Sequence, residues 1–263
     1  MQEHIEYCMG TAFVFRIRSA YKPAQLQVAL EKLHEADSIF SLYKADSPLS
    51  QLSRGETTVA KCPPVVNQIW DECEKWEKIT DGFFSPFTPE HTFDPSGLVK
   101  TWAAQEAANY LLSEGIDDFT INAGGDILIS DKSSDPVDWR VGISKPISIA
   151  EEGAGVFTVL DLKNTKFRAV ASSGHAERGD HIWNPRTGAW AEREVAQVSV
   201  IASDLVTADV WATACYAMGT SAIERVINYN KEHLDDHIQL IMQLPGGDVL
   251  GTTGVELLFA RPN

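Results

Sequence analysis

The chain has few cysteines, few basic residues and no long apolar run. Its 4 cysteines among 263 residues form no CxxC pair and match no zinc-site spacing, so we expect reduced, structural thiols. No segment approaches the roughly 18 consecutive apolar residues of a membrane span. Because 22 basic residues face 37 acidic ones, the composition argues against nucleic acid as a partner.

Familiar nucleotide and hydrolase motifs are missing as well. The sequence contains no GxGxxG after a strand and no GxSxG nucleophile elbow. The glycine-rich segment 246–253 has Thr252 where a phosphate loop needs lysine. His233 and His237 are spaced for a metal on a helix face, but the acidic residues between them favour a solvated loop.

The first residues contain neither a basic stretch nor an apolar stretch of the kind that makes a signal peptide. We therefore expect a cytoplasmic protein, while a processed exported form stays open. The net charge of −15 sets a further constraint. An anionic ligand needs local compensation from a metal ion, from one or two placed lysines or arginines, or from helix N-termini.

The composition, 44% hydrophobic and 22% charged, is that of an ordinary globular chain. Because no repeat, low-complexity tract or linker divides it, we expect one large domain over residues 1–263, with a two-lobed shape left open. Apolar spacing and prolines at the entry predict helices at residues 22–43, 63–80, 96–115, 205–218 and 221–230. Alternating or short apolar runs predict strands at residues 11–18, 119–121, 127–129, 139–143, 156–160, 168–171, 195–201, 238–243 and 249–252. Clustered strands separated by helices indicate an α+β fold with packed helices.

Short polar and glycine-containing clusters adjoin these elements, as they do where a scaffold presents a functional site. In one of them, Asp209 and Thr213 are four residues apart, so a helix would place both on one face. A carboxylate and a hydroxyl are oxygen ligands that suit Mg²⁺, although Asp209 could equally cap or pair locally. The clusters occupy residues 9–11, 40–43, 80–84, 93–100, 122–126, 181–188 and 208–214.

In content and order these clusters resemble the ApbE family, the FAD:protein FMN transferases. The resemblance runs from residue 9 to about residue 219 and predicts an ApbE-like fold with clustered antiparallel strands. Three positions depart from the family pattern. Ser85 stands where many members have Asp, Thr101 replaces a Gly, and Asn184 replaces an Asp. A side chain at Thr101 is expected to crowd the bound nucleotide.

The resemblance implies a transferase that binds FAD, cleaves its pyrophosphate and attaches FMN to a threonine or serine of an acceptor flavoprotein, with release of AMP. It places Mg²⁺ on the side chains of Asp209 and Thr213 and on a carbonyl that we assign to Gly97. We expect Asp209 to be a partly exposed carboxylate. His181 is the candidate general base, since an imidazole titrates near neutral pH. A purely structural role for His181, holding the turn at residues 185–188, stays open.

The remaining implied contacts are to FAD. We expect Met9, Tyr43 and the segment 83–85 to wall the flavin, because an isoalloxazine needs flat apolar neighbours. Asp94 is expected at the ribose or adenine. The full set of predicted FAD contacts is Met9, Tyr43, Phe83, Phe84, Ser85, Asp94, Lys100 and Trp183. Two alternatives remain at this stage: an FAD pyrophosphatase that makes FMN and AMP, and a non-catalytic FAD-binding protein.

Overall fold

The computed structural model describes residues 1–146, 155–174, 183–191 and 194–260. Its helices are α1 (Pro23–Phe40), α2 (Pro48–Ser53), α3 (Pro64–Ile79), α4 (Ser96–Ser113), α5 (Leu205–Met218) and α6 (Ala222–Glu232), with short 3₁₀ helices η1 (Val59–Lys61), η2 (Gly219–Ser221) and η3 (Val255–Leu258). Its strands are β1 (Gln2–Cys8), β2 (Thr11–Ile17), β3 (Phe119–Ala123), β4 (Asp126–Ile129), β5 (Arg140–Ser144), β6 (Val156–Asp161), β7 (Ala169–Gly174), β8 (Trp183–Asn184), β9 (Ala189–Trp190), β10 (Gln197–Ala202), β11 (Gln239–Gln243) and β12 (Val249–Gly251).

Eight of the strands form one sheet in the order β1-β2-β3-β4-β7-β10-β11-β12. Every neighbouring pair in this sheet is antiparallel. The strands β5 and β6, and the strands β8 and β9, form separate two-stranded units. The expected α+β fold with antiparallel strands is therefore confirmed.

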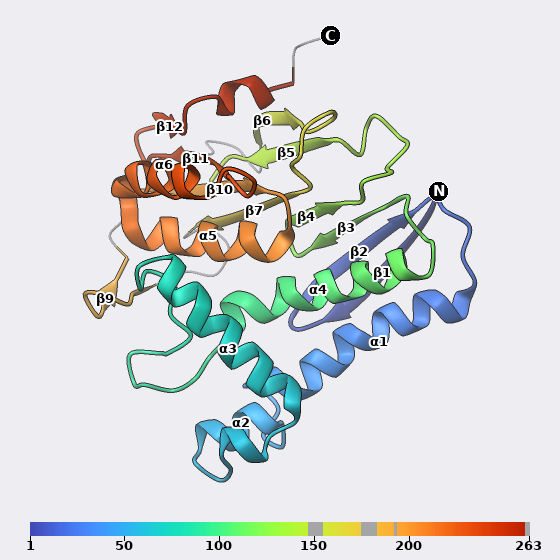
Figure 1. The fold of residues 1–263 in the computed structure, drawn as a ribbon, viewed down its shortest axis with the longest axis vertical. Helices are drawn as coiled ribbons and strands as arrows, with labels where there is room; N and C mark the ends of the chain where they lie inside the picture. Colours follow the sequence, from blue (N-terminus) through green and yellow to red (C-terminus); the bar gives the residue numbers. More distant parts are fainter. Residues whose placement is uncertain (147–154, 175–182, 192–193, 261–263) are drawn as a thin grey trace.

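The sheet carries a hydrophobic core on each face. Helices α1, α4 and α5 cover one face, where α4 packs against both α1 and α5 (Figure 1). A smaller core lies on the other face beneath β5, β6 and η3, with Trp139, Leu160 and Leu258 among its members. Because the two cores share one sheet, the chain forms a single domain. No helix in the described ranges is long and apolar enough to cross a membrane.

Local sequence explains the ends of the helices. Helix α1 begins at Pro23 in its first turn, but it ends at Phe40, three residues before the expected end, because Ser41 has an extended backbone. Helix α5 has the expected bounds. The Asp204 side chain accepts a hydrogen bond from the Thr207 backbone N–H at its start, and Gly219 ends it with a φ of 66°.

Several elements were not expected from the sequence, namely β1, α2 and the β8–β9 hairpin. Strand β1 lies at the edge of the sheet, and Ile5 and Tyr7 are 47% and 76% exposed. Its apolar side chains thus point outward instead of marking a buried face, so the alternation typical of a half-buried strand is lost.

Two of the motif clusters touch each other in the folded chain. Gly124 lies in the β3–β4 turn with a φ of +65°, a backbone conformation that L side chains rarely adopt. A Cβ on Gly124 would come within 2.4 Å of the Thr11 Oγ1 at the start of β2. The glycine therefore allows the turn to close against the first hairpin.

We expect Gly124→Ala to lower the free energy of unfolding by about 2–5 kcal/mol, the sum of left-handed strain and overpacking. The matched control is Gly247→Ala, because Gly247 also has a positive φ (+89°) but an added Cβ would meet no described atom within 4 Å. The control should lose only about 1–2 kcal/mol. Urea unfolding of both variants measures the difference, and equal losses would contradict the contact with Thr11.

Candidate active site

A cavity of about 810 Å³ opens beside the sheet. Its lining comes from strands β2, β3, β4, β5 and β7, from residues 83–90, from the start of α4, from α5 and from the β8–β9 hairpin. The volume lies in the upper part of the range for ligand sites in proteins. The folded chain thus brings segments from across the sequence to one space.

Most of the predicted site residues lie on this cavity. Those in its lining are Phe83, Phe84, Ser85, Asp94, Gly97, Lys100, Trp183, Asp209 and Thr213. His181 lies outside the described residues, so its predicted role stays a prediction. Phe84 is almost fully buried and belongs to the main core as well as to the cavity wall.

Two predicted flavin contacts, Met9 and Tyr43, are not brought to the cavity lining. Met9 occupies the turn between β1 and β2 with a φ of 51°, and it packs against the main core. Tyr43 is 100% exposed, because it follows the end of α1 in an irregular segment. These two predicted contacts therefore lie outside the cavity lining that the structure shows.

Three charged side chains meet at the cavity floor. The Lys100 Nζ lies 2.5 Å from the Asp126 Oδ2 and 3.8 Å from the Asp209 Oδ2. The Ser172 backbone N–H donates to the other Asp126 oxygen at 3.1 Å. Burial and repulsion from Asp209 raise the pKa of Asp126 to about 7, and Lys100 offsets only part of this increase. Asp126 therefore does more than shape its turn: it ties Lys100 to the sheet.

The structure corrects two expectations about Asp209 and Thr101. Asp209 is only 6% exposed, so it is a buried carboxylate. Thr101 is fully buried and is not among the described residues that line the cavity, so it has no access to crowd a nucleotide there. Instead, its hydroxyl donates to the Asp209 Oδ2 at 2.9 Å. Thr101, one of the three positions that depart from the family pattern, thus adds a hydrogen bond to the buried Asp209.

The cavity offers oxygen ligands suited to a hard cation. Asp209 and Thr213 lie on one face of α5, and the Thr213 Oγ1 is 3.3 Å from the Ser173 hydroxyl. The Asp209 carboxylate contacts Thr101 and Lys100 through Oδ2, and Oδ1 has no hydrogen bond or ion pair to another described residue. No group of three His, Cys, Asp or Glu side chains gathers in the part of the chain described. This donor set fits Mg²⁺, which keeps several waters and shares its shell with substrate phosphates, better than a zinc site.

Gly97 lies at the start of α4 and also lines the cavity. An added Cβ there would come within 3.3 Å of the Phe84 ring, so a larger residue would push the ring or the helix entry away. Asp94 accepts a hydrogen bond from the Ser96 backbone N–H at 3.0 Å, which fixes the chain as it enters the helix. The glycine and the aspartate of this motif therefore hold the first turn of α4 against the cavity.

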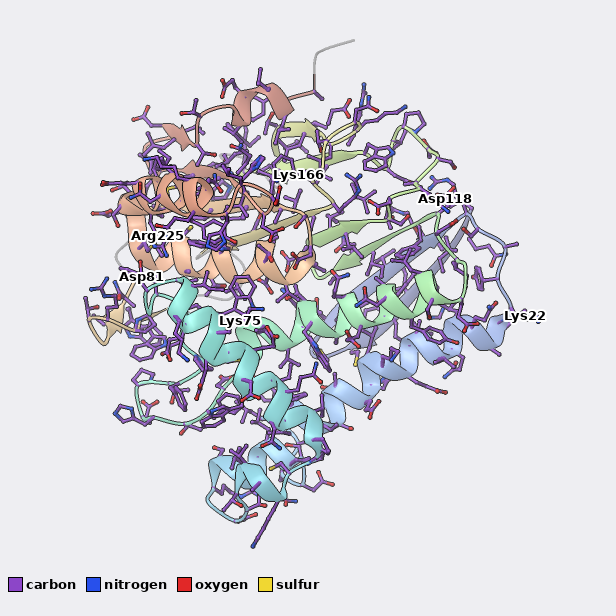
Figure 2. All side chains as sticks on the ribbon, in the orientation of Figure 1. Lys22, Lys75, Asp81, Asp118, Lys166 and Arg225 are labelled. Atoms are coloured by element: carbon purple, nitrogen blue, oxygen red, sulfur yellow. The ribbon has the colours of Figure 1, made fainter. Side chains whose placement is uncertain are left out.

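The turn after α3 is anchored from outside the cavity. The Arg225 Nε lies 2.5 Å from the Asp81 Oδ2, and an Arg225 nitrogen donates to the Ile79 carbonyl at 2.5 Å. Figure 2 shows Asp81 and Arg225 near each other, where the end of α3 meets α6. This ion pair positions the segment that contributes Phe83, Phe84 and Ser85.

The β8–β9 hairpin also borders the cavity. Trp183 pairs with Trp190 across it, and both line the cavity. The Asn184 side-chain amide donates to the Ala217 carbonyl at 3.1 Å, which ties the hairpin to the end of α5. An aspartate, usual at this position in the family pattern, would have no N–H to donate. The Arg186 guanidinium lies 5.0 Å from the Phe83 ring centre, a cation–π contact that links the hairpin to the segment after α3.

The sequence analysis missed other residues of the lining, among them Arg16, Arg140 and Trp190. Arg16 and Arg140 belong to strands whose alternation was visible in the sequence. Which face of those strands meets the cavity depends on strand order, which alternation does not report. Trp190 comes two residues after the cluster at residues 181–188. This closeness in the sequence was the one feature that could have predicted its place in the lining.

We expect Lys100→Met to lower the free energy of unfolding of the metal-free protein by about 2–4 kcal/mol, because it leaves a buried carboxylate without its cation. The loss should be larger at pH 8 than at pH 6. Asp126 has a folded pKa above its unfolded one, and the loss of Lys100 raises that pKa further. At pH 6 the buried carboxyl can bind a proton with or without Lys100, whereas at pH 8 the variant must either take up a proton or keep an unpaired buried charge.

Urea unfolding in EDTA at both pH values measures this effect. The matched control is Lys132→Met, which breaks an exposed ion pair with Asp117 at 2.7 Å and should lower the free energy of unfolding much less than Lys100→Met. Equal costs for the two variants would contradict the assignment of Lys100 to a buried charge cluster.

Known proteins with similar sequences share one described activity. Over 139 residues, the chain is 32% identical to an FAD:protein FMN transferase of Vibrio cholerae, which covers 50% of this chain and 40% of that protein. Over 147 residues it is 26% identical to the FAD:protein FMN transferase of Escherichia coli K12, covering 53% and 40%. The matches thus span about two fifths of the length of these relatives.

Solved structures show the same fold. The flavin transferase ApbE from Vibrio cholerae superposes with a TM-score of 0.78 at 19% identity, covering 98% of each chain. An ApbE protein from Thermotoga maritima gives a TM-score of 0.78 at 22% identity, covering 99% of each. The family model described as the ApbE family matches residues 87–238, more than half of the chain and most of the segments that build the cavity. The chain therefore belongs to the ApbE family.

Proposed function

We propose that the protein is an Mg²⁺-dependent FAD:protein FMN transferase. In this reaction, a threonine or serine of an acceptor flavoprotein receives FMN through a phosphoester bond, and AMP is released. The similar proteins of Vibrio cholerae and Escherichia coli bear this name. The observation that carries the proposal is that Lys100, Asp209 and Thr213 face one large cavity in an ApbE-type fold.

The proposal answers the constraint set by the net charge of −15. A pyrophosphate brought to an acidic protein needs positive charge at the point of contact. Lys100 supplies it at the cavity floor, held by Asp126 at 2.5 Å. Gly124 and Gly125 also line the cavity, but their backbone N–H groups already donate to the Ala12 carbonyl and to the Asn122 side chain, so Lys100 is the positive charge on which the proposal relies.

The Asp209 carboxylate, the Thr213 hydroxyl and the backbone carbonyl of Gly97 would hold Mg²⁺. The ion would supply neutralisation of the charge that develops on the pyrophosphate oxygens. Two features of this chain support the assignment: the buried Asp209 has one oxygen without a partner among the described residues, and Thr213 lies beside it on α5.

The transfer is an in-line displacement at phosphorus. The acceptor hydroxyl oxygen forms a bond to the FMN-side phosphorus, while the bond from that phosphorus to the bridging oxygen breaks and AMP leaves with that oxygen. His181 is the proposed general base that takes the hydroxyl proton. No covalent intermediate on the protein is needed, so the work of the side chains is positioning and charge neutralisation.

The cavity walls suit the two ends of FAD. Phe83, Phe84 and Trp183 provide flat apolar surface for the isoalloxazine, and Ser85 adds a hydroxyl beside them. One carboxylate oxygen of Asp94 accepts the hydrogen bond from the Ser96 backbone N–H, and the other is proposed to bind the ribose or adenine of FAD. The acceptor would then approach from the open side of the cavity.

We expect the protein to release AMP from FAD when Mg²⁺ and a threonine-bearing acceptor domain are present, and to leave an FMN adduct on the acceptor. Chromatography measures AMP and mass spectrometry measures the adduct. An acceptor with that threonine changed to alanine is the control. AMP without an adduct would indicate a pyrophosphatase instead, and bound FAD without AMP would indicate a non-catalytic FAD-binding protein.

The same assay includes a metal-site control. Because Asp209 is buried, Asp209→Asn is preferred to alanine, since it keeps the volume and removes the charge. AMP release should fall to the background level in this variant and stay normal in Asp131→Asn, a change at an exposed carboxylate. Equal rates would contradict the metal assignment.

We expect His181→Ala to slow FMN transfer by about 10²–10⁴-fold, because the acceptor hydroxyl loses its general base. FAD affinity, measured by quenching of flavin fluorescence, should stay within a factor of about three. His4→Ala, a change at the sheet edge, is the control. Loss of FAD affinity and melting temperature together, with little further loss of rate, would instead assign His181 to holding the neighbouring turn.

A further inference from the structure

We propose that Thr101 is a positioning residue for the cation site, because its hydroxyl holds one oxygen of Asp209 and so leaves the other oxygen for the cation. The inference rests on the proposed function, in which Asp209 binds Mg²⁺. It concerns a residue that does not touch the ligand: Thr101 acts through the carboxylate beside it.

The burial and hydrogen bonding of Thr101 support this role. Its side chain is fully buried between α4 and α5, and its Oγ1 lies 2.9 Å from the Asp209 Oδ2. The same Oγ1 is 3.2 Å from the Leu98 carbonyl within its own helix. A hydroxyl has one proton, and a charged acceptor at the shorter distance forms the stronger bond. The proton therefore goes to Asp209.

No other described side chain replaces this bond. The Lys100 Nζ is 3.8 Å from the same Asp209 oxygen, which is an ion-pair distance and too long for a hydrogen bond. The short contact of Lys100 goes to Asp126 instead, at 2.5 Å. Thr101 is thus the one hydrogen-bond donor to the Asp209 carboxylate among the residues that the structure describes.

The bond fixes the rotation of the carboxylate group. Asp209 can turn about its terminal torsion, and that torsion has broad preferences when nothing holds it. With Oδ2 bound to Thr101, Oδ1 is the carboxylate oxygen that has no hydrogen bond or ion pair with another described residue. Partners behind a metal ligand orient it in this way, and their loss typically costs about 10–100-fold in metal affinity.

The contact depends on the hydroxyl at this position. A glycine, which the resemblance to the family pattern places here, has no side chain to donate a hydrogen bond. Thr101 lies in the second turn of α4, where a glycine would also weaken the helix. Thr101 thus supplies an orienting contact that a glycine at this place cannot make.

The test is calorimetric titration of Mn²⁺ alone into the intact protein, without FAD. We expect Thr101→Val, which keeps the shape and removes the hydroxyl, to weaken Mn²⁺ binding by about 10-fold or more. Thr101→Ser, which keeps the hydroxyl, should stay within about threefold of the wild type. Thr252→Val is the matched control, because Thr252 is also buried and donates to a side chain, Gln239, away from the cavity.

A second readout separates orientation from general damage. The Mg²⁺ concentration for half-maximal AMP release should rise by about 10-fold in Thr101→Val, while the rate at saturating Mg²⁺ stays near that of the wild type. Melting temperatures show whether the variants fold. If Thr101→Val does not fold, the comparison of Thr101→Ala with Thr101→Ser tests the loss of the hydroxyl in the same way.

The outcomes are distinct. Mn²⁺ affinity in folded Thr101→Val within twofold of the wild type, an equal loss in Thr101→Ser, or an equal loss in Thr252→Val would each overturn the role of Thr101. A wild-type protein that binds no Mn²⁺ would overturn it as well. If Mn²⁺ affinity follows the hydroxyl but no FMN adduct forms, the inference stands and the transferase proposal fails.

Discussion

The burial of helix α5 is the constraint on which the site depends. Twelve of its fourteen residues are buried, and it packs against β7, β10 and α4. A helix that is apolar on all sides has one stable place in a fold, the interior between other elements. Asp209 and Thr213 are therefore held by packing along the whole helix and not by local contacts alone. The rigidity that a cation site requires comes from the hydrophobic core.

That burial has an electrostatic cost, which the neighbouring charges offset. Asp209 and Asp126 are both buried, and two carboxylates close together disfavour each other's ionisation. Lys100 lies between them, and Thr101 from the next position donates to Asp209. Lys100 and Thr101, which are consecutive in α4, thus hold Asp126 and Asp209, respectively. A cation bound beside Asp209 would complete the neutralisation that Lys100 begins.

Much of the fold was predictable, because its helices and central strands have strong periodic patterns. Helix α5 has the expected bounds, and the antiparallel strand clusters were expected. Strand β1 was not, since its apolar residues face outward at the sheet edge. The site shows the same division. Motifs predicted which segments meet, but they did not report burial, so Asp209 was expected to be partly exposed and Thr101 was expected to crowd a ligand. Both depend on contacts between helices that are far apart in the chain.

The contact between Gly124 and Thr11 also bears on how the protein assembles. These residues are separated by more than a hundred positions in the sequence, and the cavity that Gly124 lines also includes residues from β4, β7 and α5. Loop closure over such distances is slow compared with local helix formation. The cavity therefore forms only when most of the chain has folded. A ligand that binds only the folded state stabilises every part of the chain that must fold to make its site. FAD and Mg²⁺ would therefore protect the entire domain against unfolding.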